Sequence, residues 1–379
     1  MRVLHVITGL DAGGAEQWLR VLLRYSRDRA DVVALSNPGV LAEALRGDGV
    51  RVSDLGMRGN SDLAALPRLV GHIRRGRYDV VHTHLFRAQL YGGLAARLAG
   101  VRTVVSTEHS LNATLIEGRP TNRPGVRALY RAGSRLATRT VAVSGSVAER
   151  LAEWGVDPRR VVMIPVGIDK RAFAFDGQAR RRAREPLGLP AGAALVGGVG
   201  RLVASKRFDV LVRALAGIPD AHLALVGDGP ARPELAALAA RLGVRDRVHF
   251  LGELLDVAPM LSAMDVFASP SPEETFGVAI LEALAAGLPV VYVRCPALDG
   301  VGDPGPATSA GPTADAFGHE LGAALSRPGT DRSAPAVVDV YDAARSAGLI
   351  DDLYRHLVPR PTGGDGGGRE PETMGTHGA

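Results

Sequence analysis

Cysteine, lysine and aromatic residues are scarce in this chain, and it has no long apolar run. Its 379 residues include one cysteine, Cys295, so no internal disulfide can form and no metal site is implied. Aromatic residues make up 4% of the sequence, which predicts aliphatic cores of the α/β kind. No run of about 18 uncharged apolar residues occurs, and the apolar N-terminal stretch is too short for a signal peptide. These features predict a cytoplasmic protein.

Basic charge is present but is not concentrated in one region. The net charge of +5 is small for this length and is spread over both halves, so we expect no nucleic-acid partner. Nearly all the basic residues are arginines, and the two lysines are Lys170 and Lys206. A lysine in so arginine-rich a chain is therefore a candidate functional residue.

Short β-branched runs alternate with helical segments in both halves of the chain. This alternation predicts two Rossmann-like, doubly wound α/β lobes with parallel sheets, facing each other across a cleft. The expected strands lie at residues 2–8, 31–35, 50–54, 79–83, 102–107, 140–144 and 161–164, then at 194–200, 222–227, 247–252, 265–270 and 289–293. The expected domains are a first lobe at 1–168, a linker at 169–192, a second lobe at 193–336, one or two helices at 337–358 and a disordered tail at 359–379.

A glycine-containing loop follows the first expected strand. In such folds, ligands bind beyond the carboxyl ends of the strands. Residues 9–16 end in Gly13 and Gly14 at the start of a helix, where backbone N–H groups can approach an anion. The spacing differs from the dinucleotide fingerprint G-x-G-x-x-G. A tight turn without a ligand is the alternative, and a lone Gly-Gly favours it.

A second loop, at residues 200–208, presents Arg201 and Lys206 just before a helix. Cations at the start of a helix oppose its dipole, which predicts an anion between them. Two solvated surface charges are the alternative. The rarity of lysine in this chain favours a phosphate site.

The segment PSPEETFGVAILEA at residues 270–283 carries Glu274 and Glu282 around an apolar run. Thr275 is the expected N-cap of a helix. The free N–H groups of that helix would belong to Phe276, Gly277 and Val278. Eight residues of helical rise would separate the two carboxylates by about 12 Å, roughly the span from a hexose through a diphosphate to a ribose. Taken singly, a first-turn acid and a partly exposed helix residue are the better explanations of these glutamates.

Histidines follow two of the expected strands. His109 lies after the strand at 102–107, where it can donate a hydrogen bond to a sugar hydroxyl or to a developing charge. A lone histidine there more often has a structural role. His82 and His84 alternate at another strand end, but no third ligand of suitable spacing accompanies them, so we expect no metal site.

Five motifs, in this order, resemble those of the retaining nucleotide-sugar glycosyltransferases of family 4, which have the GT-B architecture. They are GG-x-E near the start, EHS after an N-terminal strand, GRL followed by SK, LVGDGP, and ETFGVAILE, and they span residues 1 to about 293. The resemblance implies that the donor binds to the C-terminal lobe and the acceptor mainly to the N-terminal lobe.

The resemblance also implies a role for each matching residue. Glu282 would bind the ribose hydroxyls, and Glu274 the hydroxyls of the donor sugar. Arg201 and Lys206 would hold the diphosphate, and His109 would lie beside the sugar and the breaking bond, so that His109, Glu274, Arg201 and Lys206 carry catalysis. The other donor contacts would be Gly14, Glu253, Leu254, Phe276, Gly277 and Val278, with Glu253 and Leu254 at the base, and the acceptor would contact Gly13 and Glu16.

The implied reaction moves a hexose-type sugar from a nucleoside diphosphate, UDP first and GDP second, to a hydroxyl of a glycan, lipid-linked or small-molecule acceptor. Cations would stabilise the charge that develops on the diphosphate, so no metal or other cofactor is expected, and the chain has no Asp-x-Asp triplet. No protein nucleophile is evident, which favours same-face attack by the acceptor. The alternatives are an inactive relative that binds a nucleotide sugar, and a sugar-nucleotide epimerase of the same architecture.

Two segments stand outside this pattern. Residues 294–300, RCPALDG, replace the Gly-Gly loop and acid that the family usually has there, which leaves the contacts of 294–335 undefined. Between residues 119 and 139, arginines recur every four residues around apolar positions, which predicts a basic amphipathic helix. A solvated face is the commoner explanation, and docking at the inner face of the membrane is the alternative. These arginines are Arg119, Arg123, Arg127, Arg131, Arg135 and Arg139.

Overall fold

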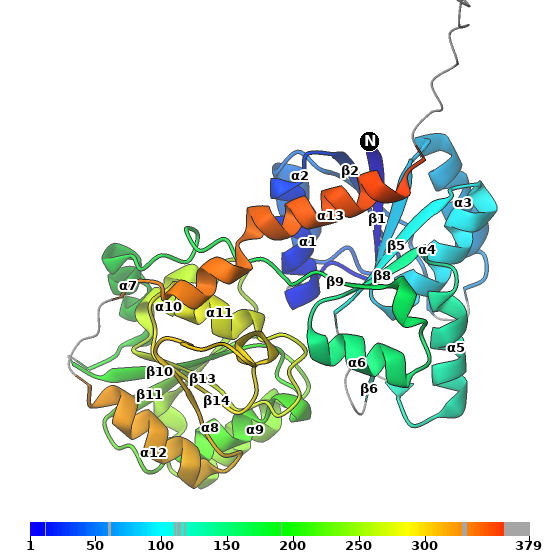
Figure 1. Cartoon of the computed structure of the whole chain (residues 1–379). Helices are drawn as coiled ribbons and strands as arrows, with labels where there is room; N and C mark the ends of the chain where they lie inside the picture. The colour runs from blue at the N-terminus through cyan, green and yellow to red at the C-terminus, as the bar shows by residue number, and fades with distance from the viewer. Residues whose placement is uncertain are drawn as a thin grey trace, which may run out of the picture.

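Two parallel sheets with helices packed around them form the two lobes of the computed structural model (Figure 1). The structure describes residues 1–11, 13–59, 62–109, 111, 115–116, 119–190, 192–327 and 332–359. Within these residues, the first sheet has seven strands in the order β3-β2-β1-β4-β5-β8-β9, and the second has six in the order β12-β11-β10-β13-β14-β15. The predicted fold class is therefore confirmed.

The N-terminal lobe is built around β1, which pairs with β2 on one side and β4 on the other. Its strands are β1 (Arg2–Ile7), β2 (Arg29–Ala34), β3 (Arg51–Asp54), β4 (Val80–His84), β5 (Thr103–Glu108), β8 (Arg139–Ala142) and β9 (Val161–Met163). Its helices are α1 (Gly14–Tyr25), α2 (Leu41–Gly47), α3 (Ala65–Gly76), α4 (Phe86–Ala99), α5 (Pro124–Ser134) and α6 (Gly145–Glu153). Because helices cover the sheet, its central strands are buried on both faces, as in Val6 and Ile7 of β1.

The C-terminal lobe repeats this design. Its strands are β10 (Ala194–Val199), β11 (Ala221–Val226), β12 (Val248–Gly252), β13 (Val266–Ser269), β14 (Val290–Tyr292) and β15 (Ala307–Ser309). Its helices are α8 (Phe208–Leu215), α9 (Arg232–Arg241), α10 (Ala258–Ala263), α11 (Val278–Ala285) and α12 (Ala314–Leu325). The paired glycines of β10 have a packing reason, because a Cβ added to Gly197 would lie 2.0 Å from the sulfur of Met264. Of these strands, β15 was not predicted from the sequence.

The chain crosses between the lobes twice, and the two crossings are hydrogen-bonded to each other. The amide of Ile168 donates to the carbonyl of Tyr341 (2.6 Å), and the amide of Ala343 donates to the carbonyl of Ile168 (3.2 Å). The ammonium of Lys170 also forms an ion pair with Asp339. Lys170 is therefore placed at the connection between the lobes.

The last described helix, α13 (Ala343–Leu357), returns to the N-terminal lobe and lies beside α1 (Figure 1). Its buried Asp351 accepts hydrogen bonds from the hydroxyl of Ser26 (2.7 Å) and the amide of Arg27 (2.9 Å). The carbonyl of Leu357 accepts one from the hydroxyl of Thr103 (3.3 Å). The end of the described chain thus completes the first lobe. Residues 360–379 of the expected tail lie outside the described residues.

The expected linker contains a helix, α7 (Gly177–Arg184), that packs against α10. Arg180 and Arg184 both contact the carboxylate of Asp265, at 2.6 and 3.3 Å. The helix has no fully buried residue and no apolar stripe, because its sequence is GQARRRAR. Ion pairs, and hydrogen bonds to the free carbonyls at the C-terminal end of α10, fix α7 in place. Hydrophobic periodicity does not reveal such contacts.

The basic segment at 119–139 is not one helix. α5 covers Pro124–Ser134, and a short antiparallel pair, β6 (Leu115–Ile116) and β7 (Arg119–Pro120), precedes it. The guanidinium of Arg119 lies over the ring of Phe86, and that of Arg127 over the ring of Trp154. The expected continuous helix is therefore wrong, because several of its arginines cap, flank or fold back onto the lobe. Among the helices of the described residues, none combines the length and hydropathy needed to cross a bilayer.

Candidate active site

The two lobes touch where the carboxyl ends of their strands face each other. Thr275, in the loop between β13 and α11, donates from its hydroxyl to the carbonyl of His109 (2.7 Å). The hydroxyl of Ser144, after β8, donates to the carbonyl of Thr275 (2.6 Å). One residue of the C-terminal lobe is thus bonded to the loops after two N-terminal strands. This contact brings together the predicted sites after residues 102–107 and 265–270.

A cation and an acid meet beside this contact. The ammonium of Lys206 forms an ion pair with the carboxylate of Glu274, and both side chains are largely buried. The hydroxyl of Ser271 donates to the backbone carbonyl of Ser205 (3.4 Å), which is a second contact between the two loops. Arg201 is exposed on the same loop as Lys206, and its guanidinium has no ion-pair partner among the described residues. Arg201 is therefore available to bind an anionic ligand.

The expected N-cap at Thr275 is wrong, because α11 begins at Val278 with Gly277 as its N-cap. The hydroxyl of Thr275 is used in the contact with His109, and Phe276 turns into the core against the ring of Tyr341. Gly277 then takes the left-handed conformation, at φ 99°. Glu274 therefore precedes the helix, and the expected separation from Glu282 by helical rise does not apply.

Gly277 is also required for space. A Cβ added at this position would lie 2.4 Å from Cys295 Sγ. Cys295 belongs to the atypical segment 294–300, and burial raises the pKa of its thiol to about 12. Cys295 is thus a buried core residue, and its side chain limits the space around Gly277 in the loop that carries Glu274.

Glu282 lies within α11, and Leu281 and Ala283 beside it are completely buried. Burial raises the pKa of its carboxyl group to about 8. No hydrogen bond or ion pair joins it to another described residue. An acid in such surroundings needs a partner if it is to ionise, and ribose hydroxyls are suitable donors to it.

The loop that ends in Gly13 and Gly14 lies near the C-terminal lobe, which is contacted by the helix that follows it, α1. Gly13 is the N-cap of α1, and Gly14 is exposed with open space around it. The carboxylate of Glu16 folds over Gly13, since an added Cβ there would lie 2.3 Å from it. The side-chain amide of Gln17 donates from Nε2 to the carbonyl of Leu255 (3.1 Å), next to Glu253 and Leu254 after β12. The first turn of α1 therefore faces the predicted base-binding segment.

His109 is buried, and desolvation lowers its pKa to about 3, so the ring is neutral. Its Nε2 lies 3.2 Å from Nδ1 of His84. The third histidine that the sequence analysis missed is His5, which reaches His84 from β1 because the two strands run in register. Contacts between strands that lie 79 residues apart have no local sequence signal.

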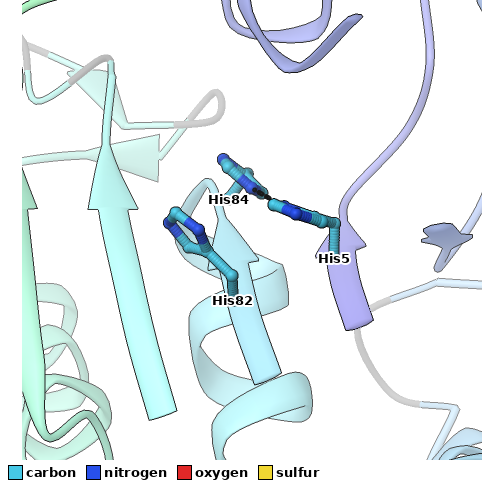
Figure 2. A group of neighbouring side chains, drawn as sticks. All are labelled: His5, His82 and His84. Atoms are coloured by element: carbon cyan, nitrogen blue, oxygen red, sulfur yellow. Dashed lines mark hydrogen bonds between the residues drawn. The ribbon is translucent and has the colours of Figure 1, made fainter. Parts of the chain in front are cut away.

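His5, His82 and His84 are the group of possible metal ligands found among the described residues, with one ligand atom from each within 4.8 Å of the others (Figure 2). Their ring nitrogens are largely occupied by hydrogen bonds. His82 bonds to the hydroxyls of Tyr354 and Thr107, and His84 bonds to His5 and His109. A metal ion would have to displace these bonds, so the geometry favours a hydrogen-bonded cluster.

Ser144 and Gln17 are site residues that the sequence analysis missed. Ser144 is the last residue of the expected strand at 140–144 and lies two positions after the end of β8, much as His109 directly follows the end of β5. Reading every loop after a strand would have found it. Gln17 lies one turn inside α1, and only the packing of the two lobes identifies it.

The comparisons with known proteins agree with this arrangement. The family described as Glycosyltransferase Family 4 matches residues 12–171, and the one described as Glycosyl transferases group 1 matches residues 193–326. A D-inositol 3-phosphate glycosyltransferase of Mycolicibacterium vanbaalenii is 30% identical over 399 aligned residues, which cover 94% of this chain and 87% of that protein. One from Xylanimonas cellulosilytica is 38% identical over 248 residues, which cover 60% of this chain and only 58% of that protein.

Solved structures share the fold. The Anabaena protein HepE in complex with UDP and glucose has a TM-score of 0.81 at 23% identity, over 94% of this chain and 99% of that one. A UDP-GlcNAc 2-epimerase from Methanocaldococcus jannaschii has a TM-score of 0.63 at 11% identity, over 94% and 100% of the two chains. With two family matches and a relative aligned over most of its length, the chain belongs to the glycosyltransferases of family 4 and has their GT-B fold.

Proposed function

We propose that the protein transfers a hexose from a nucleoside diphosphate sugar, UDP first and GDP second, to an acceptor hydroxyl with retention of configuration and without a metal. The observation that carries this proposal is the ion pair of Lys206 and Glu274 beside the contact of Thr275 with His109. A cation and a carboxylate lie beside the lobe contact, and His109, whose ring is neutral, contributes its carbonyl to that contact. These are the groups needed for a phosphate, a sugar hydroxyl and the breaking bond.

In this proposal the diphosphate lies between Arg201, Lys206 and the first turn of α1. When the bond from the anomeric carbon to the phosphate oxygen breaks, negative charge develops on that oxygen, and these groups stabilise it. The acceptor hydroxyl attacks on the same face, and its proton passes to the departing phosphate oxygen. The chain supplies electrostatic stabilisation and orientation, and no covalent intermediate with the protein is formed.

The sugar and the nucleoside occupy the two sides of the diphosphate. Glu274 accepts hydrogen bonds from hydroxyls of the sugar, and His109 donates one to the sugar or the developing charge. Glu282 accepts from the ribose, and the segment of Glu253 and Leu254 contacts the base. Gly13 and Glu16 face the acceptor. Because the relatives are D-inositol 3-phosphate glycosyltransferases, a cyclitol phosphate is one small-molecule acceptor to test.

Incubation with UDP- and GDP-hexoses, with and without acceptor, tests the proposal. Free nucleoside diphosphate that appears only with acceptor, in the presence of EDTA, together with a product of unchanged anomeric configuration by NMR, supports it. An isomerised donor without release would indicate an epimerase, an activity suggested by one structural neighbour's name. Tight binding without turnover would indicate an inactive relative.

A further inference from the structure

Three histidines form a hydrogen-bonded chain that leads from the central strand of the N-terminal sheet to the site. His5 Nδ1 lies 3.0 Å from His84 Nε2, and His84 Nδ1 lies 3.2 Å from His109 Nε2. The neighbouring rings are stacked, with interplanar angles of 21° and 28°. Figure 2 shows the inner bond, between His5 on β1 and His84 on β4. All three rings are buried.

The three imidazoles are neutral. Burial lowers the pKa of His5 and His109 to about 3, and that of His84 well below its ordinary value. A neutral imidazole carries one N–H, so one ring nitrogen donates and the other accepts. Each bond in the chain needs one N–H from one of its two rings.

This requirement couples the three tautomers. If His84 carries its proton on Nδ1, it donates to His109, whose proton must then be on Nδ1, and it accepts from Nδ1–H of His5. If His84 carries its proton on Nε2, both neighbours must carry theirs on Nε2. The two bonds can therefore coexist in only two states, with all three protons on Nδ1 or all three on Nε2.

We infer that His84 and His5 are positioning residues that hold the His109 ring in place as the Nδ1–H tautomer, so that its outer nitrogen is a hydrogen-bond donor. This inference rests on the proposed function for what His109 donates to, but the tautomer itself does not depend on it. Each state leaves one terminal N–H without a partner among the described residues, on His5 Nε2 in the all-Nε2 state and on His109 Nδ1 in the all-Nδ1 state. His109 is the more exposed of the two residues, at 8% against 2%, and lies at the contact between the lobes, so its N–H has better access to an acceptor. An unpaired N–H in the core is costlier than an unpaired acceptor.

His84 allows a matched pair of substitutions. The side-chain amide of asparagine lies near the Nδ1 position of a histidine, and that of glutamine near the Nε2 position. His84→Asn keeps the bond to His109 and loses the bond to His5, whereas His84→Gln does the reverse. Both variants remove one buried hydrogen bond, so a purely structural role predicts the same loss from each.

We expect His84→Gln to lower kcat by roughly tenfold or more, the lower end of what is seen for residues that orient metal-bound histidines, with little change in the KM for the donor. His84→Asn should stay within about threefold of the wild type, since it keeps the bond that orients His109. His82→Gln is the control. His82 is as buried as His84 but lies outside the hydrogen-bonded chain of His5, His84 and His109, where it bonds to Tyr354 and Thr107. His82→Gln should therefore lower the Tm and leave kcat close to that of the wild type.

Nitrogen NMR of the histidine rings in the full chain gives a readout that does not need turnover. The wild type should show His109 protonated on Nδ1, and His84→Gln should give a mixture of tautomers. A wild-type His109 protonated on Nε2, an unchanged ring in His84→Gln, or a stoichiometric metal ion on His5, His82 and His84 by elemental analysis would each overturn the inference. If no acceptor supports transfer but the tautomer is as expected, the proposed function fails and the positioning chain stands.

Discussion

Lys206 and Glu274 lie 68 positions apart in the sequence and form an ion pair at the contact between the lobes. The pair joins the loop after β10 to the loop after β13. Because both side chains are largely buried, each neutralises the other until a ligand offers separate partners. A nucleotide sugar could do this, with its phosphate on the ammonium and its sugar hydroxyls on the carboxylate.

The first prediction concerns the two lysines. Lys206→Ala should lower kcat/KM for the donor by about 100-fold, because it removes a cation from the diphosphate and leaves Glu274 unpaired. Calorimetric titration with UDP and GDP should show the weaker binding directly. Lys170→Ala is the matched control, since its ion pair with Asp339 is exposed and should contribute no more than about 1 kcal/mol. Equal losses in the two variants would contradict the site.

The second prediction concerns the ionisation of Glu282. Its pKa is raised from 4.5 to about 8 in the folded chain, so the folded state binds a proton that the unfolded state releases. The stability that this proton contributes is fully present below pH 4.5 and is lost as the pH rises through about 8. Glu282→Gln should remove this part of the pH dependence.

Urea unfolding of the wild type and of Glu282→Gln across this pH range measures the difference. At about 1.4 kcal/mol per pKa unit, the free energy of unfolding of the wild type should fall by a few kcal/mol more than that of the variant. Glu253→Gln, on an exposed loop, should keep the wild-type profile. Parallel profiles for wild type and Glu282→Gln would show that Glu282 ionises normally.

The third prediction concerns Gly277. Gly277→Ala should destabilise the chain, because alanine pays about 1–2 kcal/mol in the left-handed conformation and its Cβ would clash with Cys295 Sγ. Adding Cys295→Ala should relieve the clash and restore that part of the stability, but it should leave the cost of the left-handed backbone at position 277. Melting temperatures of the two single variants and the double variant form a cycle that separates the two causes. An additive cycle would mean that the thiol does not crowd this position.

The fourth prediction concerns two exposed arginines of α5, Arg123 at its N-cap and Arg131 in its last turn. Contact with membrane remains a prediction, and Arg123 and Arg131 are exposed near Leu129, whose side chain is 48% exposed. If the surface docks, Arg123→Glu with Arg131→Glu should weaken binding to phosphatidylserine vesicles by tenfold or more, at about 1 kcal/mol per charge. Arg241→Glu, exposed at the end of α9 in the other lobe, is the control. Equal binding by all three proteins would exclude a role for this surface.

The sequence predicted most of the fold because the strands are apolar runs between helices, a local pattern that parallel sheets require. Elements held by polar contacts escaped it. α7 has no apolar stripe and depends on Asp265, and β15 is the edge strand ATS, which has no fully buried residue and no apolar run. The continuous basic helix failed because spacing of arginines says nothing about which of them fold back onto aromatic rings.

The candidate site was predictable where chemistry and loop position coincide in the sequence, as for Lys206, Glu274 and His109. The prediction failed where a side chain bonds to a residue that is far away in the sequence. The hydroxyl of Thr275 suits an N-cap, but it bonds across the lobe contact to a carbonyl 166 positions away. His5 looked like an ordinary strand residue, because only the register of β1 with β4 places it against His84.

The return of α13 to the first lobe has a consequence for how the protein is made. On the ribosome, the strands of the N-terminal sheet emerge long before residues 343–357. Ser26, Thr103 and His82 therefore have no hydrogen-bond partner in α13 until that helix has been synthesised. The second lobe, whose contacts are closer in sequence, can mature first although it is translated later. A release of the nascent chain before α13 would leave the earlier lobe open along α1, and chaperone binding should be strongest in that interval.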